Sequence, residues 1–581
     1  MRAAHTASGA HPLPAGQTRF ALWAPAAQRV EVHIDGQAQA LQAEGDGWFG
    51  ATLAGPAGSR YHYRVDGGPA LPDPASRAQV GDVHGDSQVV DLGAYRWQVD
   101  DWRGRPWHET VLYEVHPGLF GGFRGLEAFL PRLVELGVTA LELMPLGAFS
   151  GERNWGYDGV LPYAPASAYG SPQDLQRLID QAHALGLMVF IDVVYNHFGP
   201  DGNYLHSYAK AFFRDDQQTP WGPAIDFRQE PVRRFFIDNA LMWVRDYRVD
   251  GLRLDAVHAI GDARLLVDLA DEARRAANGR HLHLVLENEH NQAGLLRGSY
   301  QAQWNDDFHN VLHVLLTGEQ EGYYADFKDN PTQRLARCLS EGFIYQGEPT
   351  RRGEPRGEPS ADLPPTAFVS FLQNHDQTGN RALGERLASL AEPAALRASV
   401  ALLLLCPMIP LLFMGEDWGE RRPFFYFTDF HGDLARAVCE GRREEFREFA
   451  HFSSSDAAER IPDPNAVDTF EASRPDLRNG DCQCRGYYRR LLELRHAEII
   501  PRLAGARALG AAVLGERAVA ARWLLGDGSR LHILLNLGRE TLPVPRPAGA
   551  RVLFCEGQPV EAYRDGQLGP NAIVISLEES V

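Results

Sequence analysis

The pattern of apolar and polar residues changes twice along the chain. From residue 17 to about residue 95, short runs such as RFALWAP, VEVHIDG and RYHYRVDG are separated by Gly, Pro and Asp turns, which is typical of a small β-sandwich. From residue 111 onward, apolar strands alternate with amphipathic helices, which indicates repeated βα units. After a helix near 486–498, β-like runs such as RLHILLNLG and AIVISLEE return. We expect an N-terminal β-sandwich (1–95), an α/β catalytic region (96–500) and a C-terminal β-domain (501–581).

The central region supplies eight candidate strands, the number that a (β/α)8 TIM barrel requires. In order they are VLYEVH (111–116), VTALELM (138–144), LMVFIDVVY (187–195), GLRLDAV (251–257), HLVLEN (283–288), QWNDDF (303–308), AFVSFLQN (367–374) and PLLFMG (410–415). These strands span more than the roughly 250 residues of such a barrel, so insertions are required. Residues 198–230 show no clear periodicity, and residues 346–365 repeat GEP three times. We expect a mobile loop in the second stretch rather than a binding motif.

Two barrel helices have clear apolar faces, one over Leu126–Leu136 and one over Leu175–Leu185. Ser171, Pro172 and Asp174 form a start signal for the second helix.

Composition and charge narrow the class of partner. Lys and Arg total 57 against 76 Asp and Glu, giving a net charge of −19, which disfavours nucleic acid or an anionic membrane as a partner. The six cysteines show neither a disulfide framework nor zinc-ligand spacing. The first residues lack a secretory-signal pattern, so a cytoplasmic location is the default expectation. The apolar run Val400–Met414 is shorter than a membrane span and contains two prolines, so we interpret it as barrel core.

Polar residues gather at the ends of four predicted strands. Active sites of (β/α)8 barrels lie at the carboxyl ends of the strands, where side chains from different strands converge. The residues at these ends are Asp192, Asn196, His197, Arg253, Asp255, Glu287, His375 and Asp376. Asp255 and Glu287 are one βα unit apart, so they are predicted to come from neighbouring strands and to face one another.

This arrangement suits glycoside hydrolysis, which needs one carboxyl to attack or to activate water and another to protonate the departing oxygen. Arg253 lies two residues before Asp255 and would share its side of the strand, favouring an ionised nucleophile. Glu287 follows an apolar run that could desolvate it and retain its proton. Asp376 would stabilise an oxocarbenium-like transition state. Taken singly, a strand-end Asp could equally be structural, and a lone His is more often structural; the four strand ends together favour the catalytic interpretation.

These strand ends resemble the four short motifs of the α-amylase family, glycoside hydrolase family 13, as DVVYNH (192–197), GLRLDAVH (251–258), LENE (286–289) and FLQNHD (371–376). The resemblance implies Asp255 as nucleophile, Glu287 as acid/base and Asp376 as transition-state stabiliser. It also implies that Tyr157 in NWGYD stacks on the sugar in the cleavage subsite. The other substrate-binding residues implied by these motifs are Asp192, Asn196, His197, Arg253, His258 and His375.

Within the family, three segments resemble the maltooligosyltrehalose trehalohydrolases in particular: PDPASRAQVGDVHGDSQVVD (72–91), FLQNHDQTGNRALGERL (371–387) and PLLFMGEDWGERRPFFYFTDF (410–430). The resemblance implies cleavage of the α-1,4 bond next to the terminal trehalose of a maltooligosyltrehalose, and functional pairing with a maltooligosyltrehalose synthase. Glu416 and Trp418 follow strand eight and are further candidates for substrate binding, because carboxylates and aromatic rings suit sugar hydroxyls and faces.

Two alternatives remain at this point: a branching or debranching enzyme of the same family, and a catalytically inactive amylase-like binding subunit. The second usually loses acidic residues, whereas this chain keeps all three carboxylates. Asn196 stands where some amylases contribute a calcium ligand, but one Asn falls far short of the 6 to 8 oxygens that calcium requires. We expect no cofactor and no essential metal.

Overall fold

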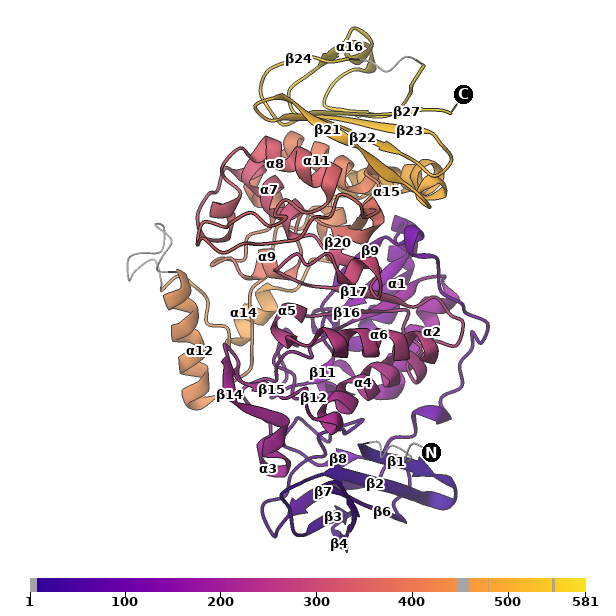
Figure 1. The fold of residues 1–581 in the computed structure, drawn as a ribbon, viewed down its shortest axis with the longest axis vertical. Coiled ribbons are helices and arrows are strands. Elements are labelled where there is room, and N and C mark those ends of the chain that lie inside the picture. Colours follow the sequence, from indigo (N-terminus) through magenta and orange to yellow (C-terminus); the bar gives the residue numbers. More distant parts are fainter. Residues whose placement is uncertain (1–7, 447–458, 479, 546–548, 581) are drawn as a thin grey trace.

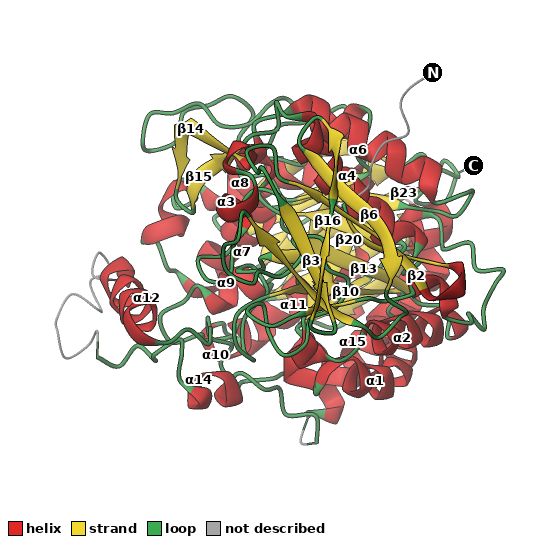
Figure 2. Ribbon diagram, turned by 90° about the horizontal axis from the view of Figure 1, so that it is seen from below, coloured by secondary structure: helices red, strands yellow, loops and turns green. Residues whose placement is uncertain are grey.

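The computed structural model describes residues 8–446, 459–478, 480–545 and 549–580. An N-terminal pair of β-sheets lies at one end of the long axis, the central barrel lies in the middle, and a C-terminal sheet lies at the other end (Figure 1). Figure 2 shows the strands gathered at the centre with helices around them.

Eight parallel strands close into a barrel in which the first and last strands pair. In chain order the strands are β9 (Leu112–Val115), β10 (Ala140–Leu143), β13 (Met188–Val193), β16 (Gly251–Leu254), β17 (His283–Leu286), β18 (Ala302–Trp304), β19 (Phe368–Ser370) and β20 (Ile409–Phe413). Six lie within the runs expected from the sequence, and β18 and β20 overlap theirs but begin one residue earlier, so the predicted (β/α)8 barrel is confirmed.

Helices cover the outside of the barrel. The main ones are α1 (Gly122–Leu136), α2 (Pro172–Ala184), α4 (Glu230–Arg245), α6 (Ala263–Ala276), α7 (Asp306–Thr317), α8 (Pro331–Glu341), α11 (Pro393–Leu405) and α15 (Cys482–Leu494). Helix α2 begins as expected, because Ser171 and Asp174 form a reciprocal capping box and Pro172 occupies the first turn. The apolar run from Val400 forms the end of α11 and strand β20, both buried.

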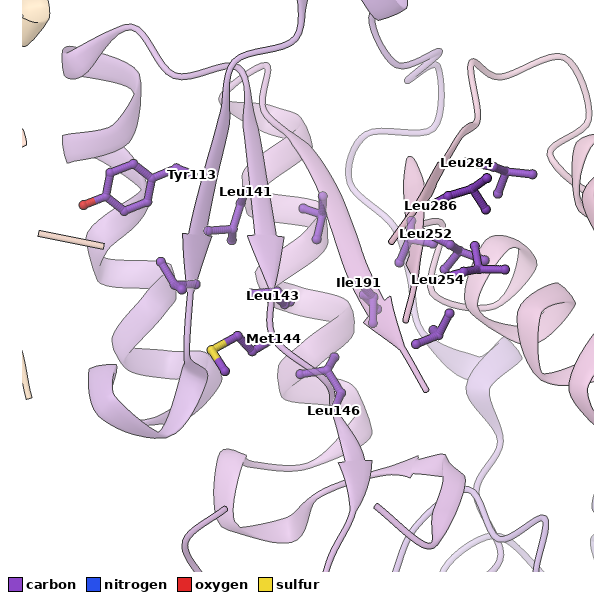
Figure 3. Packing of buried hydrophobic residues seen from close by; sticks show 14 of the residues in the cluster. Tyr113, Leu141, Leu143, Met144, Leu146, Ile191, Leu252, Leu254, Leu284 and Leu286 are labelled. Atoms are coloured by element: carbon purple, nitrogen blue, oxygen red, sulfur yellow. The ribbon is translucent and has the colours of Figure 1, made fainter. Parts of the chain in front are cut away.

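Alternation along the strands sorts residues between the outside and the inside of the barrel. Leu141, Leu143, Leu252 and Leu254 point outward into the main core beneath the helices (Figure 3). Inward-facing residues form a separate apolar cluster that includes Met188, Phe190, Val285 and Trp304. Along β13 the apolar positions are followed by Asp192 toward the carboxyl end, and the neighbouring strands add the polar inward residues Glu142 and Arg253. The barrel interior therefore has an apolar floor and a polar upper layer, and the candidate site lies at the polar end.

The two expected insertions differ in structure. Residues 198–230 contain a short helix, α3 (Leu205–Tyr208), and a hairpin of β14 (Phe213–Thr219) and β15 (Gly222–Ile225), which the sequence pattern did not indicate. The segment 346–365 is mainly irregular and lies against the segment that follows β17. Gly357 N–H donates to the carbonyl of His290, and Glu358 N–H donates to that of Asn291, each at 3.1 Å. Its mobility stays a prediction.

Two further helices follow β20, α12 (Gly432–Glu445) and α14 (Val467–Ala472), neither of which periodicity indicated. Helix α12 lies at the side of the molecule (Figure 1).

Both terminal regions are β-structures, as expected. The N-terminal sheets have the orders β1-β2-β6-β5 and β4-β3-β7-β8, with strands β1 (Gly9–Leu13), β2 (Gln17–Trp23), β3 (Val30–Ile34), β4 (Gln37–Ala40), β5 (Gln42–Gly45), β6 (Trp48–Ala54), β7 (Arg60–Val65) and β8 (Ser87–Gln88). The C-terminal sheet has the order β21 (Arg507–Gly515), β22 (Ala518–Leu524), β23 (Arg530–Asn536), β27 (Ala572–Glu578) and β25 (Arg551–Glu556). Among the described residues, none of the helices combines the length and apolar composition that a membrane span requires.

The hydrogen bonds of Arg495 can be tested as contacts that hold the last barrel unit together. Its buried guanidinium donates to the carbonyls of Leu404, Cys406 and Met408 at 2.7–2.9 Å, which join α11 to β20. We expect Arg495→Met to destabilise the fold by about 3 kcal/mol or more, because buried carbonyls would lose their donors. Thermal unfolding followed by circular dichroism measures this. Arg489→Met, at a half-exposed side chain of the same helix, is the control; equal melting temperatures for both variants would contradict the expectation.

Candidate active site

Asp255 and Glu287 directly follow the neighbouring strands β16 and β17. These strands pair in parallel with Leu254 opposite Leu286, so the two carboxyl side chains leave the barrel at the same level. The peptide N–H of Ala256 donates to Glu287 Oε2 at 2.7 Å. Ala256 adopts a left-handed conformation, with φ of 40°. The turn that follows Asp255 therefore holds the carboxyl of Glu287, as the expected pairing of these residues requires.

Arg253 holds Asp255 in place from inside the barrel. Its Nη1 lies 2.8 Å from Asp255 Oδ1 and 2.7 Å from Asp192 Oδ2, and its guanidinium lies over the Trp304 ring, 4.2 Å from the ring centroid. Asn196 Nδ2 donates to Asp255 Oδ2 at 2.9 Å. Both carboxylate oxygens of Asp255 therefore accept a hydrogen bond, which fixes the orientation of this side chain.

Glu287 has the opposite environment. Burial raises the pKa of its carboxyl well above the ordinary value, against the opposing charge of Arg253. The nearby carboxyls of Asp255, Asp306 and Asp376 raise that pKa further. Glu287 therefore keeps a proton at a pH where an ordinary glutamate has lost it.

Asp376 lies in the first turn of α9 (His375–Gly379), whose N-cap is Asn374. Burial alone would raise the pKa of Asp376, but the charge and hydrogen bond of His375 lower it below the ordinary value. His375 Nε2 lies 3.4 Å from Asp376 Oδ1, and its Nδ1 contacts the buried carboxylate of Glu114 at 2.5 Å. Although burial opposes it, these two carboxylates raise the pKa of His375 well above the ordinary value. At neutral pH the pair is therefore an imidazolium beside an ionised Asp376.

Two aromatic contacts line the approach to the carboxyls. The Tyr157 ring stacks on His375 with centroids 5.0 Å apart, and its hydroxyl donates to Asp192. The ring of His197 stacks on Trp221, 4.4 Å between centroids, and burial lowers the pKa of His197. Trp221 lies in the turn between β14 and β15 and is 47% exposed. An exposed indole held beside the buried polar residues is a surface that suits a sugar face.

His258 lies on α5 (Val257–Ile260), the short helix that follows Asp255. Its Nδ1 accepts the N–H of Glu289 at 3.4 Å, and burial lowers the pKa of its ring. His258 is therefore at the edge of the site, between the ends of β16 and β17.

Glu416 and Trp418 are not brought into this group. Glu416 Oε2 accepts the N–H of Phe413 at 2.7 Å, and burial raises its pKa to about 8. Trp418 is 2% exposed and packs against Phe129 and Arg132 of α1. Both make packing contacts beneath the end of β20, so substrate contact by either stays a prediction.

Sequence reasoning missed two residues of this site, Asp306 and Trp221. Asp306 follows β18, where Gln377 Nε2 donates to its Oδ1 at 2.9 Å. Burial, with a contribution from Asp376, raises the pKa of Asp306 to about 7. The strand-end rule, applied to QWNDDF, would have found Asp306. No signal marked Trp221, because its position depends on a hairpin without periodicity.

The polar layer beneath the site contains two carboxyls that the sequence did not single out, Glu114 beside His375 and Glu142. Glu142, on β10, is 2% exposed, and neither of its oxygens has a hydrogen-bond partner among the described residues. Burial raises the pKa of Glu142 well above the ordinary value, and the charges of Glu114 and Asp192 add to the rise. Glu142 is thus a neutral carboxylic acid in a layer that also holds the charged Arg253 and His375.

Asn196, the candidate calcium ligand, uses its side-chain amide for contacts within the protein. Its Nδ2 donates to both the carbonyl oxygen and the carboxylate of Asp255, and its Oδ1 contacts His197. Within the described ranges, no group of three or more His, Cys, Asp or Glu residues is arranged to hold a metal ion.

The arrangement supplies the groups for acetal chemistry at one end of the barrel. An oriented carboxylate at Asp255 stands beside a protonated carboxyl at Glu287, with a second negative charge at Asp376. A carboxylate can attack the acetal carbon while the acid protonates the leaving oxygen, and the remaining charge favours an oxocarbenium-like transition state.

Models of three protein families match the chain. The family described as alpha amylase, catalytic domain, matches residues 108–221. Carbohydrate-binding module 48, the isoamylase N-terminal domain, matches residues 8–75, and a domain of unknown function, DUF3459, matches residues 506–575.

The chain is similar to curated and solved proteins over most of its length. It is 42% identical to the malto-oligosyltrehalose trehalohydrolase of Deinococcus radiodurans, covering 93% of this chain and 91% of that protein. A crystal structure of a putative alpha amylase from Salmonella typhimurium superposes with a TM-score of 0.93 at 44% identity, covering 99% of this chain and 100% of that one. The 1,4-alpha-glucan branching enzyme of Rhodospirillum rubrum is 34% identical over only 43% of this chain and 39% of its own length.

The buried acid Glu142 predicts a pH dependence of stability. Because its folded pKa lies above the unfolded value, its contribution favours the fold at low pH. That contribution is lost as pH rises above the unfolded pKa, by up to about 1.4 kcal/mol per pH unit. We expect the melting temperature of Glu142→Gln to fall less than that of the wild type between pH 5 and pH 8. Glu135→Gln, at an exposed carboxylate of α1, is the control; parallel curves for wild type and Glu142→Gln would refute the assignment.

Proposed function

We propose a function for this chain from the premise that it belongs to the malto-oligosyltrehalose trehalohydrolases, within the α-amylase family of glycoside hydrolases. It would hydrolyse the α-1,4-glucosidic bond next to the terminal trehalose of a maltooligosyltrehalose, releasing trehalose and a maltooligosaccharide. The observation that carries the proposal is the similarity to the Deinococcus trehalohydrolase over nearly the whole chain, together with the carboxyl set at the barrel mouth.

In the first half of the proposed reaction, Asp255 attacks the anomeric carbon of the glucose that is linked to trehalose. Glu287 gives its proton to the glycosidic oxygen, so that trehalose leaves as a neutral alcohol and the glucan chain stays on Asp255 as an ester. The raised pKa of Glu287 supports the acid role. The hydrogen bonds from Arg253 and Asn196 support the nucleophile role, because they hold the carboxylate in one orientation.

In the second half, the Glu287 carboxylate takes a proton from water, and the resulting hydroxide displaces Asp255 from the anomeric carbon. Glu287 is then protonated and Asp255 is again free, so one water is consumed per turnover. Two displacements at the same carbon preserve the α configuration. Asp376, kept ionised by His375, would stabilise the positive charge that develops on the sugar ring in both steps.

Sugar contacts are proposed for the residues around these carboxyls. Tyr157 and His375, stacked on one another, and His197 would bind the glucose in the cleavage subsite, while Asp192 and Arg253 fix their surroundings. His258, Glu416 and Trp418 are weaker members of this proposal, because their contacts are to protein groups.

A cytoplasmic location and functional pairing with a maltooligosyltrehalose synthase are also proposed. The six cysteines are all free thiols, as expected in a reducing compartment. We also propose domain boundaries near residues 95 and 500.

The deciding experiment compares maltopentaosyl-trehalose with a plain maltooligosaccharide of equal length. We expect rapid release of trehalose from the first and slow attack on the second, measured by chromatography of trehalose and by reducing-end assay over time. Preferential attack on the plain chain, or transfer that makes α-1,6 links without new reducing ends, would refute the proposal in favour of another activity of the family. No turnover of either would favour a binding protein.

Variants of the carboxyls separate their roles. Asp255→Asn is expected to abolish turnover while the protein still folds, because the amide cannot form the ester but keeps an oxygen that can accept from Arg253. Glu287→Gln is expected to spare substrates whose leaving group needs no protonation, such as an activated α-glucosyl fluoride, far more than the natural substrate. Full activity of Asp255→Asn, or equal losses on both substrates for Glu287→Gln, would contradict these roles.

The covalent route also predicts the configuration of the new reducing end. Proton NMR during the first turnovers is expected to detect the α anomer before mutarotation adds the β form. Initial appearance of the β anomer would indicate direct attack by water and would remove Asp255 from its nucleophilic role.

A further inference from the structure

Helix α12, which follows the last barrel strand, reaches the segment that carries Asp376. No residue between Gly432 and Glu445 is buried as a whole, so the helix lacks an apolar face pressed into the core. The Arg442 side chain is nevertheless only 9% exposed. Phe446, immediately after the helix, packs with Ala382 and Ile461. The helix is thus held at its C-terminal end, beside the loop that follows α9.

Arg442 contacts that loop through its guanidinium. Nη2 donates to the carbonyl of Gly379 at 2.6 Å, and Nη1 donates to Asn380 Oδ1 at 3.4 Å. The amide of Asn380 in turn donates through Nδ2 to Asp376 Oδ1 at 3.3 Å. A chain of hydrogen bonds therefore runs from α12 to the carboxylate at the mouth of the barrel.

The chemistry of the three groups fixes the direction of this chain. A guanidinium has only donors, and an ionised carboxylate has only acceptors. The Asn380 amide can satisfy both neighbours in one orientation alone, with its oxygen toward Arg442 and its nitrogen toward Asp376. Without Arg442, the amide oxygen of Asn380 would lose its donor, and only the bond to Asp376 would hold the amide, so the contact with Asp376 would loosen.

A second contact ties Arg442 to the same site. Its guanidinium lies over the ring of Tyr426, 5.5 Å from the centroid. Tyr426 packs edge-on against Trp155, and Trp155 packs edge-on against His375, the partner of Asp376. Arg442 is thus connected to both members of the His375–Asp376 pair.

We propose that Arg442 is a positioning residue for the reaction, and that it acts through Asn380 to hold Asp376 in the orientation that stabilises the transition state. Arg442 does not touch the reacting atoms. This inference rests on the proposed function, because it assigns a role in the step that Asp376 assists.

The test begins with the rate of trehalose release from maltopentaosyl-trehalose. Arg442→Gln is expected to lower kcat by about tenfold with KM changed less than about twofold, the size of effect that one loosened hydrogen bond to a charged group produces. Arg442→Lys, which keeps the charge and a donor, is expected to recover part of the loss. Arg436→Gln, at an exposed side chain of the same helix, is the matched control and should behave as wild type.

A pH profile distinguishes positioning from simple stabilisation. The charged and titratable groups that interact electrostatically with Asp376 are His375 on its own helix, Arg253 from β16, Glu287 after β17, Asp306 at the start of α7, Tyr157 and Tyr323. The Asn380 hydrogen bond is among those that lower the pKa of Asp376. Its loss in Arg442→Gln should therefore move the acidic limb of kcat/KM to higher pH, whereas a merely structural role would lower the melting temperature and leave that limb in place.

A double-mutant cycle supplies the second arm, and it remains informative if Arg442→Gln folds poorly, since Arg442→Lys can replace it. If Arg442 acts through Asn380, then adding an Arg442 substitution to Asn380→Leu should cost little further kcat. Additive losses, an unmoved acidic limb, or an Arg442→Gln kcat within twofold of wild type would each overturn the proposal. Failure of the wild type to release trehalose would instead overturn the proposed function itself.

Discussion

The buried guanidinium of Arg253 is the interaction on which the upper half of the barrel depends. It lies over Trp304, at the boundary of the apolar floor, and pairs with Asp192 and Asp255 from two neighbouring strands. A charge in this position is costly unless its partners are fixed. The two aspartates satisfy that requirement, and the pairing in turn orients the proposed nucleophile at the carboxyl end of β16.

The other buried charges lie around Arg253 and its two aspartate partners. His375 is an imidazolium between Glu114 and Asp376, which matches two negative groups with a positive one. Further buried carboxyls, Glu142 and Glu287, keep their protons because burial raises the pKa of each and the charge of Arg253 does not offset that rise. Contact with His375 thus keeps Asp376 ionised while burial keeps Glu287 protonated, and the proposed catalytic roles follow from this difference.

Much of this could be predicted from the sequence, because the barrel imposes two strict rules. Parallel strands buried on both faces read as continuous apolar runs, and their carboxyl ends converge, so the places of Asp255, Glu287 and Asp376 at the strand ends could be predicted from position alone. What escaped prediction depends on contacts between distant segments. The side chain of Trp221 belongs to a hairpin without periodicity, and the buried state of Glu142 reflects three neighbouring strands. Likewise, Glu416 and Trp418 follow a strand end, yet their side chains pack against other protein groups. The strand-end rule does not distinguish such residues from those that face the site.

Ala256 illustrates how closely the two proposed catalytic carboxyls are joined. Its left-handed turn presents one peptide N–H to Glu287 directly after Asp255, a conformation that any residue with a Cβ adopts only at an energetic cost. The pair is therefore a single structural unit of loop and side chains. Anyone grafting this chemistry onto a different barrel would have to transfer the turn itself, since copying two acidic residues onto adjacent strands would leave the acid without the donor that aims it.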